Sequence, residues 1–265
     1  YSKNDYMMKG VEVWDESVRK YVPSNRRRFH DDYFSLLAQV EVGVSGKRWA
    51  DDFFVTASYS KVDKELQTGS IQTKVYGMAE RNGSAYNVSA QYRKKDFLLK
   101  GLQMHSMLSH TWDYSLTVDT AYRVYDWNGN YVESSRNEIT GRERSLRHYK
   151  CPTTMFRSNW DYRFHPQHAL NLNYLFNRTG NDRYDDVDDS FVPSNDVVCK
   201  HIIGLSYQQQ LWQEKMENTF FIKDYINHLN IRQTDLYWQT GSDKVKGEST
   251  GNYLGYGAGT RVKFR

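Results

Sequence analysis

Long hydrophobic runs are absent from this sequence. No window holds the ~18 continuous apolar residues that a membrane-spanning helix needs, so helical spans are excluded. Hydrophobic residues make up only 38% of the 265 residues and the mean hydropathy is −0.82. A compact soluble protein of this size is usually nearer half apolar. These shortages say nothing against spans made of strands, because only every second residue of such a strand faces lipid.

Cysteine and net charge are also scarce. The two cysteines, Cys151 and Cys199, form no CxxC motif, which excludes a metal or redox site of that type. An oxidising compartment would permit a disulfide between them, but spacing alone does not establish its geometry. We expect two unpaired thiols near strand ends. The formal net charge is only +4, and no run of Lys and Arg predicts a nucleic-acid partner. The arginine triplet at 26–28 is interpreted as a solvated loop.

Aromatic residues, in contrast, are abundant. They reach 15% of the chain, with 21 Tyr, 12 Phe and 7 Trp. Disordered chains are poor in aromatics, so disorder is excluded. Low hydropathy combined with many aromatics is typical of a membrane β-barrel, in which Tyr, Phe and Trp gather in two interfacial girdles.

Alternation of apolar and polar residues is the main pattern along the chain. Between positions 33 and 44 every even residue is apolar, and the odd residues are largely polar. The pattern is weaker at 102–108, and at 218–226 it is irregular enough to predict a β-bulge. Nine stretches are predicted as strands: 33–44, 53–60, 86–93, 102–108, 156–164, 170–177, 203–208, 218–226 and 254–264.

The connections between these stretches alternate in length. Short links are expected at 45–50, 94–100, 165–167 and 212–215, and long ones at 61–84, 113–150, 180–198 and 230–252. Loops longer than ~15 residues are uncommon in compact soluble domains. Short turns on one side and long loops on the other are typical of outer-membrane barrels, with the short turns in the periplasm. The predicted fold class is therefore all-β, an antiparallel transmembrane β-barrel segment of about nine long strands.

Strand register predicts which side chains share a face, because a slip of one residue would reverse every side chain. One set is expected to point outward: Phe34, Leu36, Val40, Tyr86, Val88, Trp160, Leu172 and Tyr256. A second set is expected to point inward: Glu41, Gln91, Asp161, Asn171 and Arg261.

The odd number of spans predicts an incomplete barrel, since bacterial barrels of one chain have an even strand number. Residues 1–30 are interpreted as another long outer loop, in which a strand at 7–14 is an option. The final span ends at Phe264 and Arg265 with no loop beyond it. We therefore expect residues 1–265 to be one part of a single barrel domain.

Several strings also resemble a known family. RRRFHDDYF, KRWADDFFVTASYS, YRKKDFLLKGL, HALNLNYLFNRTGNDR, CKHIIGLSYQQQL and the closing GYGAGTRVKF are similar to barrel segments of TonB-dependent receptors of the Bacteroidetes type. The resemblance covers roughly Arg26 to Arg265. It implies a bacterial outer-membrane receptor whose large barrel is plugged by a separate N-terminal domain and energised through a TonB box. The plug, the TonB box and the closing C-terminal strands are expected to lie outside residues 1–265.

Few residues suggest local chemistry. The densest cluster is an acidic loop, whose carboxylates are of the type that binds calcium, although the glycine and terminal glutamate of an EF-hand are missing. A solvated outer loop is the preferred interpretation. Its members are Asp182, Asp185, Asp186, Asp188 and Asp189.

Catalysis is not expected. His105 and Ser106 are neighbours, so in a strand they point to opposite faces, which breaks the simplest dyad, although Ser109 shares a face with His105. No zinc spacing involves the histidines, and His165 and His168 are assigned to a turn. No GxSxG elbow occurs, and no cofactor or metal is predicted. Four aromatics of the long loops would suit stacking on a ligand, but girdle and loop packing is preferred: Tyr122, Tyr125, Trp127 and Tyr184.

The expected function is import of a glycan fragment, metal chelate or peptide across the outer membrane with TonB-supplied energy. Expected partners are outer-membrane lipids, the protein's own plug domain, the TonB complex and, as an option, a surface lipoprotein. The alternatives are a passive porin-like barrel and a soluble binding β-sandwich with long loops.

Overall fold

The structure is a computed structural model that describes residues 1–213, 215–233 and 245–263. Fifteen β-strands make up its regular structure in these ranges. Within these ranges no residue is helical, so the described chain has no helix that could cross a membrane. The strands are β1 (Ser2–Lys3), β2 (Met7–Asp15), β3 (Lys20–Arg27), β4 (Asp32–Ser45), β5 (Asp52–Glu65), β6 (Glu80–Lys94), β7 (Leu102–Asp119), β8 (Arg123–Tyr125), β9 (Tyr131–Glu133), β10 (Ser145–Lys150), β11 (Thr153–His165), β12 (His168–Asp185), β13 (Ser194–Leu211), β14 (Met216–Gln233) and β15 (Val245–Val262).

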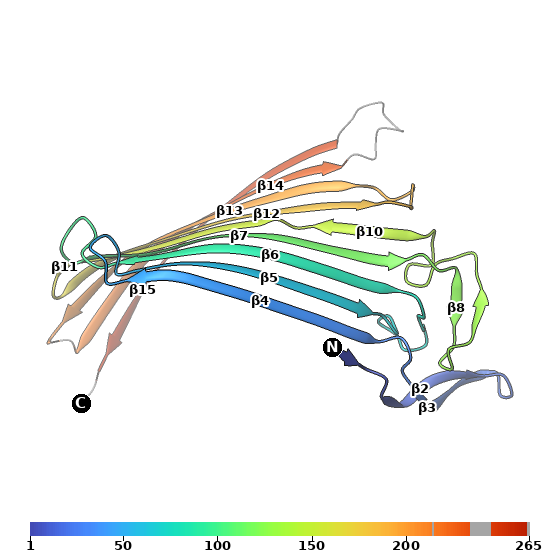
Figure 1. Cartoon of the computed structure of the whole chain (residues 1–265). Coiled ribbons are helices and arrows are strands. Elements are labelled where there is room, and N and C mark those ends of the chain that lie inside the picture. The colour runs from blue at the N-terminus through green and yellow to red at the C-terminus, as the bar shows by residue number, and fades with distance from the viewer. Residues whose placement is uncertain (214, 234–244, 264–265) are drawn as a thin grey trace.

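One antiparallel sheet of eleven strands dominates the fold. Its strands follow chain order from β4 to β7 and from β12 to β15, while β10 and β11 both lie between β7 and β12. The short turns lie at one end of the sheet and the longer connections lie at the other end (Figure 1). We call these the turn end and the loop end.

The nine predicted spans are confirmed as the nine long strands of this sheet: β4, β5, β6, β7, β11, β12, β13, β14 and β15. The four short links also lie where they were predicted, at 46–51, 95–101, 166–167 and 212–215. Consecutive strands pair in register as hairpins, for example Val42 with Val55 and Val55 with Ala90. The alternation in the sequence therefore located the strands and their order correctly.

The predicted long loops were too long, because the strands continue beyond their apolar stretches. The connection after β5 is 66–79 rather than 61–84, and β7 extends to Asp119. The largest error is at 180–198, where Gly180 pairs with Val197 and Arg183 with Ser194, which leaves only 186–193 unpaired. The loop predicted at 230–252 was also too long, because 230–233 belong to β14 and 245–252 to β15, while residues 234–244 lie outside the described residues. These strand positions are largely polar, so the apolar alternation does not reach them, although their backbone stays in the ladder.

A single strand position between β7 and β12 is divided into β10 and β11. Proline has no N–H to donate, so it interrupts a ladder, and Pro152 lies at the break. The backbone on both sides stays bonded: Cys151 N donates to Asp113 O at 2.8 Å, and Gly180 N donates to Pro152 O at 2.8 Å. Residues 145–150, predicted as loop, thus complete this strand position at the loop end.

The bulge predicted within 218–226 was wrong. β14 pairs with β13 in one uninterrupted register from Leu211–Met216 to Val197–Asn230. The alternation is irregular for another reason. Phe221 and Tyr225 are directed to the face that is polar elsewhere, while Asp224 lies on the face that is apolar elsewhere.

Residues 1–30 contain a hairpin, β2–β3, which includes the strand considered at 7–14. This hairpin, the connection 66–79, the small sheet β8–β9 and the segment 134–144 pack together at the loop end (Figure 1). We call them the loop-end module. Val11, Val75 and Trp127 form its buried core, with Met8, Val13 and Tyr125 packed against it. The long connections are therefore folded around a core of their own.

Gln67 ties this module to the start of β4. Its side chain is 1% exposed. The side-chain oxygen accepts the backbone N–H of Phe29 at 2.7 Å and of His30 at 2.8 Å, and the side-chain amide donates to the carbonyl of Tyr76 at 3.1 Å. Each of these backbone groups would otherwise be buried without a partner, which costs about 1–3 kcal/mol per group.

Two buried carboxylates connect the other segments of the module. Asp119, the last residue of β7, accepts the backbone N–H groups of Glu138, Ile139 and Thr140 at 2.9, 3.0 and 3.3 Å. Glu138 in turn accepts those of Gly77 and Met78 at 3.2 and 3.0 Å. Burial raises the pKa of Glu138 above its ordinary value of 4.5, opposed by these two N–H groups.

The raised pKa of Glu138 predicts a pH dependence of the module. A group whose pKa is higher in the folded state stabilises that state fully below its unfolded pKa, and this stabilisation is lost as pH rises through the folded pKa. Amide exchange at 66–79, corrected for its intrinsic pH dependence, should therefore lose protection as pH is raised from about 4.5. Glu138→Gln should reduce the dependence, and Asp119, whose pKa burial also raises, should account for the part that remains. Protection that increases with pH in the parent protein would contradict this.

Candidate functional site

The register divides the large sheet into two faces of different character. Residues directly opposite each other in neighbouring strands point to the same side. One row of such partners begins at Tyr256 and is apolar through Ile222, Leu205, Leu172, Trp160 and Met104. A row on the other side contains Asp52, Arg93, His105, Asn159 and Asn173. We call these sides the apolar face and the polar face.

The two predicted sets of residues lie on opposite faces, as the sequence indicated. The eight expected outward residues, from Phe34 to Tyr256, all belong to the apolar face, and the five expected inward residues, from Glu41 to Arg261, all belong to the polar face. Which face is directed outward stays a prediction, since the described strands form an open sheet.

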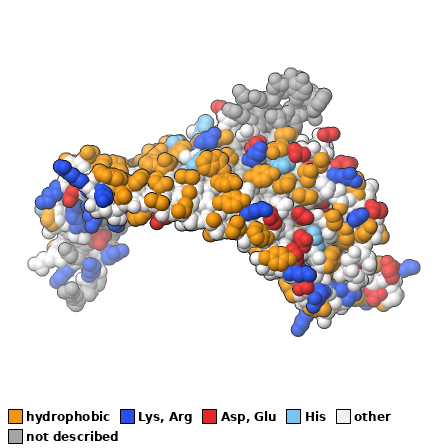
Figure 2. Space-filling view, in the orientation of Figure 1, with side chains coloured by type: hydrophobic (Ala, Val, Ile, Leu, Met, Phe, Trp, Pro, Cys, Tyr) orange, Lys and Arg blue, Asp and Glu red, His pale blue; other side chains and the backbone are white. Residues whose placement is uncertain are grey.

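The apolar face is exposed. Val40 is 60% exposed, Leu254 65% and Tyr256 83%. Hydrophobic side chains gather over the middle of the strands, and charged side chains are concentrated towards the two ends (Figure 2). Monomeric soluble proteins rarely expose a contiguous apolar surface of this extent. The described residues do not form a second sheet packed over this face, which a sandwich would require.

The apolar residues form a band that runs obliquely across the strands. The row of direct partners that starts at Val40, in the middle of the apolar run of β4, ends at Thr250 on β15. The apolar run of β15 is instead centred on Tyr256, about six residues nearer the turn end. Six residues are ~20 Å and eight strand spacings are ~38 Å, so the band is inclined by roughly 30° to the rows. Closed barrels have strand tilts of about 35–45°.

Aromatic rings border the band on both sides. Towards the turn end, Trp49 contacts Phe53, Phe97 contacts Trp160, and Tyr207 contacts Phe220, with ring centroids 5.6, 5.6 and 6.3 Å apart. Towards the loop end the contacts join Tyr59 to Tyr86, His110 to Trp112, and Phe176 to His201, at 4.7, 4.2 and 5.0 Å. Two aromatic borders are the arrangement expected of interfacial girdles.

The polar face carries a chain of side-chain amides on β11 and β12. Asn159 donates to Asn173, Asn173 donates to Asn171, and Asn171 donates to the carboxylate of Asp161. A side-chain amide has two N–H donors and an oxygen with two lone pairs. Each amide of the chain therefore keeps donors or acceptors that can bind a further partner. This surface is suited to contact with water or with a polar ligand.

A hollow of about 410 Å³ lies beside these amides, lined by Asp52, Phe54, Gln91, Tyr92, Arg93 and His105. Arg93 forms an ion pair with Asp52 at its edge. His105 belongs to this hollow, whereas Ser106 lies on the apolar face and shares a hydrogen bond of 2.7 Å with Ser158. The dyad considered in the sequence is therefore not formed. No local sequence pattern predicts the Arg93–Asp52 pair, because the pair depends on the register of β5 and β6.

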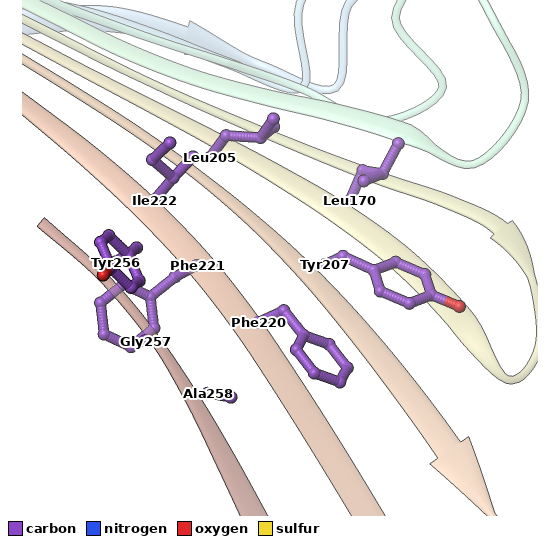
Figure 3. Close-up of a pocket in the computed structure, with 9 residues that line it drawn as sticks. All are labelled: Leu170, Leu205, Tyr207, Phe220, Phe221, Ile222, Tyr256, Gly257 and Ala258. Carbon is purple, nitrogen blue, oxygen red and sulfur yellow. The ribbon is translucent and has the colours of Figure 1, made fainter.

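A larger depression of about 610 Å³ lies on the apolar face near the turn end of β12–β15 (Figure 3). Leu170, Tyr207, Phe220 and Ala258 are among its lining residues. The hydroxyl of Tyr207 is already bonded to His168 Nδ1 at 2.7 Å. A ligand site usually combines apolar walls with a few converging polar groups. This depression has the apolar walls alone, so we assign it to the apolar surface and not to a ligand site.

The acidic loop is bound into the fold by its own neighbours. Asp185 accepts hydrogen bonds from Leu146 N at 3.0 Å and from Val187 N at 3.1 Å. Arg147 lies 3.5 Å from Asp185 and 3.7 Å from Asp188, and His148 Nε2 lies 2.9 Å from Asp186. In the described ranges no group of three or more His, Cys, Asp or Glu side chains is arranged to hold a metal ion.

The four loop aromatics are all engaged within the protein. Trp127 is buried at 3% exposure, and Tyr125 packs against the same core. Tyr122 donates to Glu143 at 2.5 Å, and Tyr184 stacks on His148 with centroids 4.5 Å apart. Packing within the loops, rather than stacking on a ligand, accounts for these side chains.

The two cysteines are free thiols, as expected. Cys151 lies in the break between β10 and β11, near strand ends as predicted, whereas Cys199 lies inside β13, so its predicted position was wrong. His165 and His168 flank the turn 166–167, with ring centroids 5.3 Å apart. His168 is fixed by Tyr207, as described above, and not by another histidine.

Comparison of the chain with protein-family models, with curated proteins and with solved structures gave no match. The features of the molecule that bear on function are therefore its two faces, the oblique band and the arrangement of the two ends.

The revised boundaries of the loop between β12 and β13 give a prediction. Replacement of residues 187–192 by a Gly-Ser linker of equal length should leave the fold intact, because these residues lie outside the ladder. Deletion of 180–198 should prevent folding, because it removes ladder pairs with both β13 and β10. A heat-modifiability gel reports the folded form. A folded 180–198 deletion would show that this end of β12 is dispensable.

Proposed function

We propose that this chain is part of an outer-membrane β-barrel that acts as a TonB-dependent receptor and imports a ligand. The observation that carries the barrel is the oblique apolar band with its two aromatic borders. On β4 the apolar positions run from Phe34 to Val44, about 33 Å along the strand, which at a strand tilt of about 40° corresponds to the ~25 Å apolar height of such barrels. The receptor class rests on the resemblance of the strand and turn sequences.

The free edges of the sheet support a closed barrel. On its outer side β4 is paired only at Tyr33 and Asp32, with β1, and β15 is paired only with β14. Unpaired backbone groups cost several kcal/mol each in hydrocarbon, so a sheet in a membrane requires partners along both edges. Further strands would supply them. In a barrel of the 22-stranded class, the nine long strands would form somewhat less than half of the wall.

The polar face would then line the lumen. It carries the amide chain, the Arg93–Asp52 pair and exposed cations such as Lys223, all of which are costly against lipid and tolerated against water. A separate plug domain would fill this lumen, and the TonB complex would move it. The ligand would meet the outer loops and the lumen surface first. A glycan fragment, a metal chelate and a peptide are all compatible with these surfaces.

Of the two alternatives, the passive porin shares the barrel and differs only in energy coupling. Loss of uptake on removal of the inner-membrane energiser supports the receptor, and uptake that continues supports the porin. The soluble sandwich is disfavoured by the uncovered apolar face. It would also leave the protein soluble without detergent, whereas a barrel requires detergent for extraction. A surface lipoprotein would be a partner at the loop end.

Substitutions on the two faces of β6 test the orientation. Val88→Arg places a cation on the apolar face and should reduce the free energy of folding into bilayers by about 2–4 kcal/mol, if Val88 lies near the midplane. Gln91→Arg places the same group on the polar face and serves as the matched control, with little expected effect. Folding is measured by titration with denaturant in the presence of vesicles.

The opposite result would reverse the assignment. If Val88→Arg folds normally and Gln91→Arg does not, the polar face is directed to lipid. If neither substitution changes folding into bilayers, Val88 does not lie near the midplane on the lipid-facing side, and the proposed position of the apolar band is contradicted.

A further inference from the structure

The turn end of the sheet carries a concentration of unpaired positive charge. Six exposed cations lie in or next to the four turns, and in the described ranges none has an acidic group within 4.0 Å. They are Lys47, Arg48, Lys95, Lys100, Arg163 and Lys215. Arg163 has only a backbone contact, to the carbonyl of Pro166 at 3.2 Å.

The described acids at this end already have partners. Asp51 accepts from Lys95 N at 2.6 Å and from Lys94 Nζ at 3.2 Å. Asp52 pairs with Arg93, and Asp96 accepts from Gly101 N at 2.6 Å. The backbone hydrogen bond leaves the charge of Asp96 in place, but the exposed cations of the turns outnumber the described acids beside them. The loop end also has exposed cations without an ion pair in the described ranges, such as Lys3, Lys9 and Lys20, but it carries many more acids, and some of its cations form ion pairs, as Arg28 does with Asp31 at 3.1 Å.

The same turns expose large apolar side chains at their tips. Trp212 is 69% exposed and Leu98 82%, and three further residues are exposed by about half: Trp49, Leu99 and Phe164. All four turns thus combine a cation with an exposed aromatic or leucine side chain. Such a combination is typical of the membrane interface, where Trp lies at the headgroup level and Lys and Arg contact phosphates.

Two of these exposed residues also have an unfavourable backbone conformation. Leu98 has φ 62° and Trp212 has φ 52°, both in the left-handed region. Bulky L-residues are disfavoured there, and turns normally place Gly or Asn at such positions. Neither side chain is buried in the protein, so packing within the chain does not compensate for the strain. A contact outside the chain would compensate for it.

We propose that the turn end is a binding surface for anionic phospholipid headgroups of the leaflet on that side. The apolar tips would enter the headgroup region, and the cations would contact phosphate groups around them. The position fits, since the turns begin where the aromatic border of the apolar band ends. This inference rests on the proposed function, because it requires the sheet to span the membrane.

The test measures insertion of the full-length protein into preformed vesicles at low salt. One vesicle is phosphatidylcholine alone, and the other contains about one third phosphatidylglycerol. The turn variant is Lys47→Gln/Arg48→Gln/Lys100→Gln. The control, Lys3→Gln/Lys9→Gln/Lys20→Gln, removes three exposed cations from the loop end. The parent should insert at least about tenfold faster into the anionic vesicle, since each cation near such a surface contributes to attraction. The turn variant should lose most of this advantage, and the control should keep it.

A second variant separates lipid contact from a role in the turn itself. Trp212→Asn removes the indole and places a residue suited to positive φ, so the folded protein should become more stable in detergent while insertion into the anionic vesicle becomes slower. If stability in detergent and the rate of insertion both rise or both fall, Trp212 has a purely structural role. This result would overturn its assignment to lipid contact.

The outcomes distinguish this inference from the proposed function. If the parent inserts equally fast into both vesicles, the cations serve another partner, such as an acidic protein, and the inference is overturned while the barrel stands. If the turn variant and the parent respond equally to phosphatidylglycerol, it is likewise overturned. Failure of the parent to insert into either vesicle would overturn the proposed function itself.

Discussion

The cross-strand register is the constraint on which the other features of this structure depend. Each hairpin fixes which residues face each other, and one continuous antiparallel ladder extends this pairing from β4 to β15. Because side chains alternate with period two, a slip of one residue in any strand would mix the two faces. The apolar face, the amide chain from Asn159 to Asp161 and the Arg93–Asp52 pair all require the same register. The sheet is therefore specified by backbone pairing and alternation, with little buried core of its own.

The oblique band adds a second constraint to this register. In a sheet that merely covers a soluble core, nothing requires the apolar patch to shift by about six residues over nine strands. A flat layer of lipid crossing tilted strands produces such a shift. Beyond the band the strands continue as polar ladders towards the loop end. There the segments that connect them fold around Val11, Val75 and Trp127, with Gln67, Asp119 and Glu138 supplying partners for buried backbone groups.

The sequence predicted the part of the fold that depends on local alternation. It located the nine long strands, the short turns and the two faces, because an apolar residue at every second position is a local pattern. It failed where pairing continued without apolar residues: the ends of β12 and β13 at Gly180 and Val197 are polar, yet they remain in the ladder. The sequence also predicted a bulge in β14, because Phe221 lies on the face that is otherwise polar and Asp224 on the face that is otherwise apolar. The Gln67 contacts and the Arg93–Asp52 pair join distant segments, so no local pattern announces them.

The proposed membrane-spanning barrel requires one face of the sheet to meet lipid and the other to meet water. Site-directed spin labelling of β6 tests this requirement most directly. Single cysteines would be placed in turn from Tyr86 to Gln91, in full-length protein with Cys151 and Cys199 replaced by serine and reconstituted into vesicles. Labels at 86, 88 and 90 should be accessible to oxygen, which concentrates in lipid, and labels at 87, 89 and 91 to a water-soluble nickel reagent. Equal access of the nickel reagent to all six positions would contradict the account.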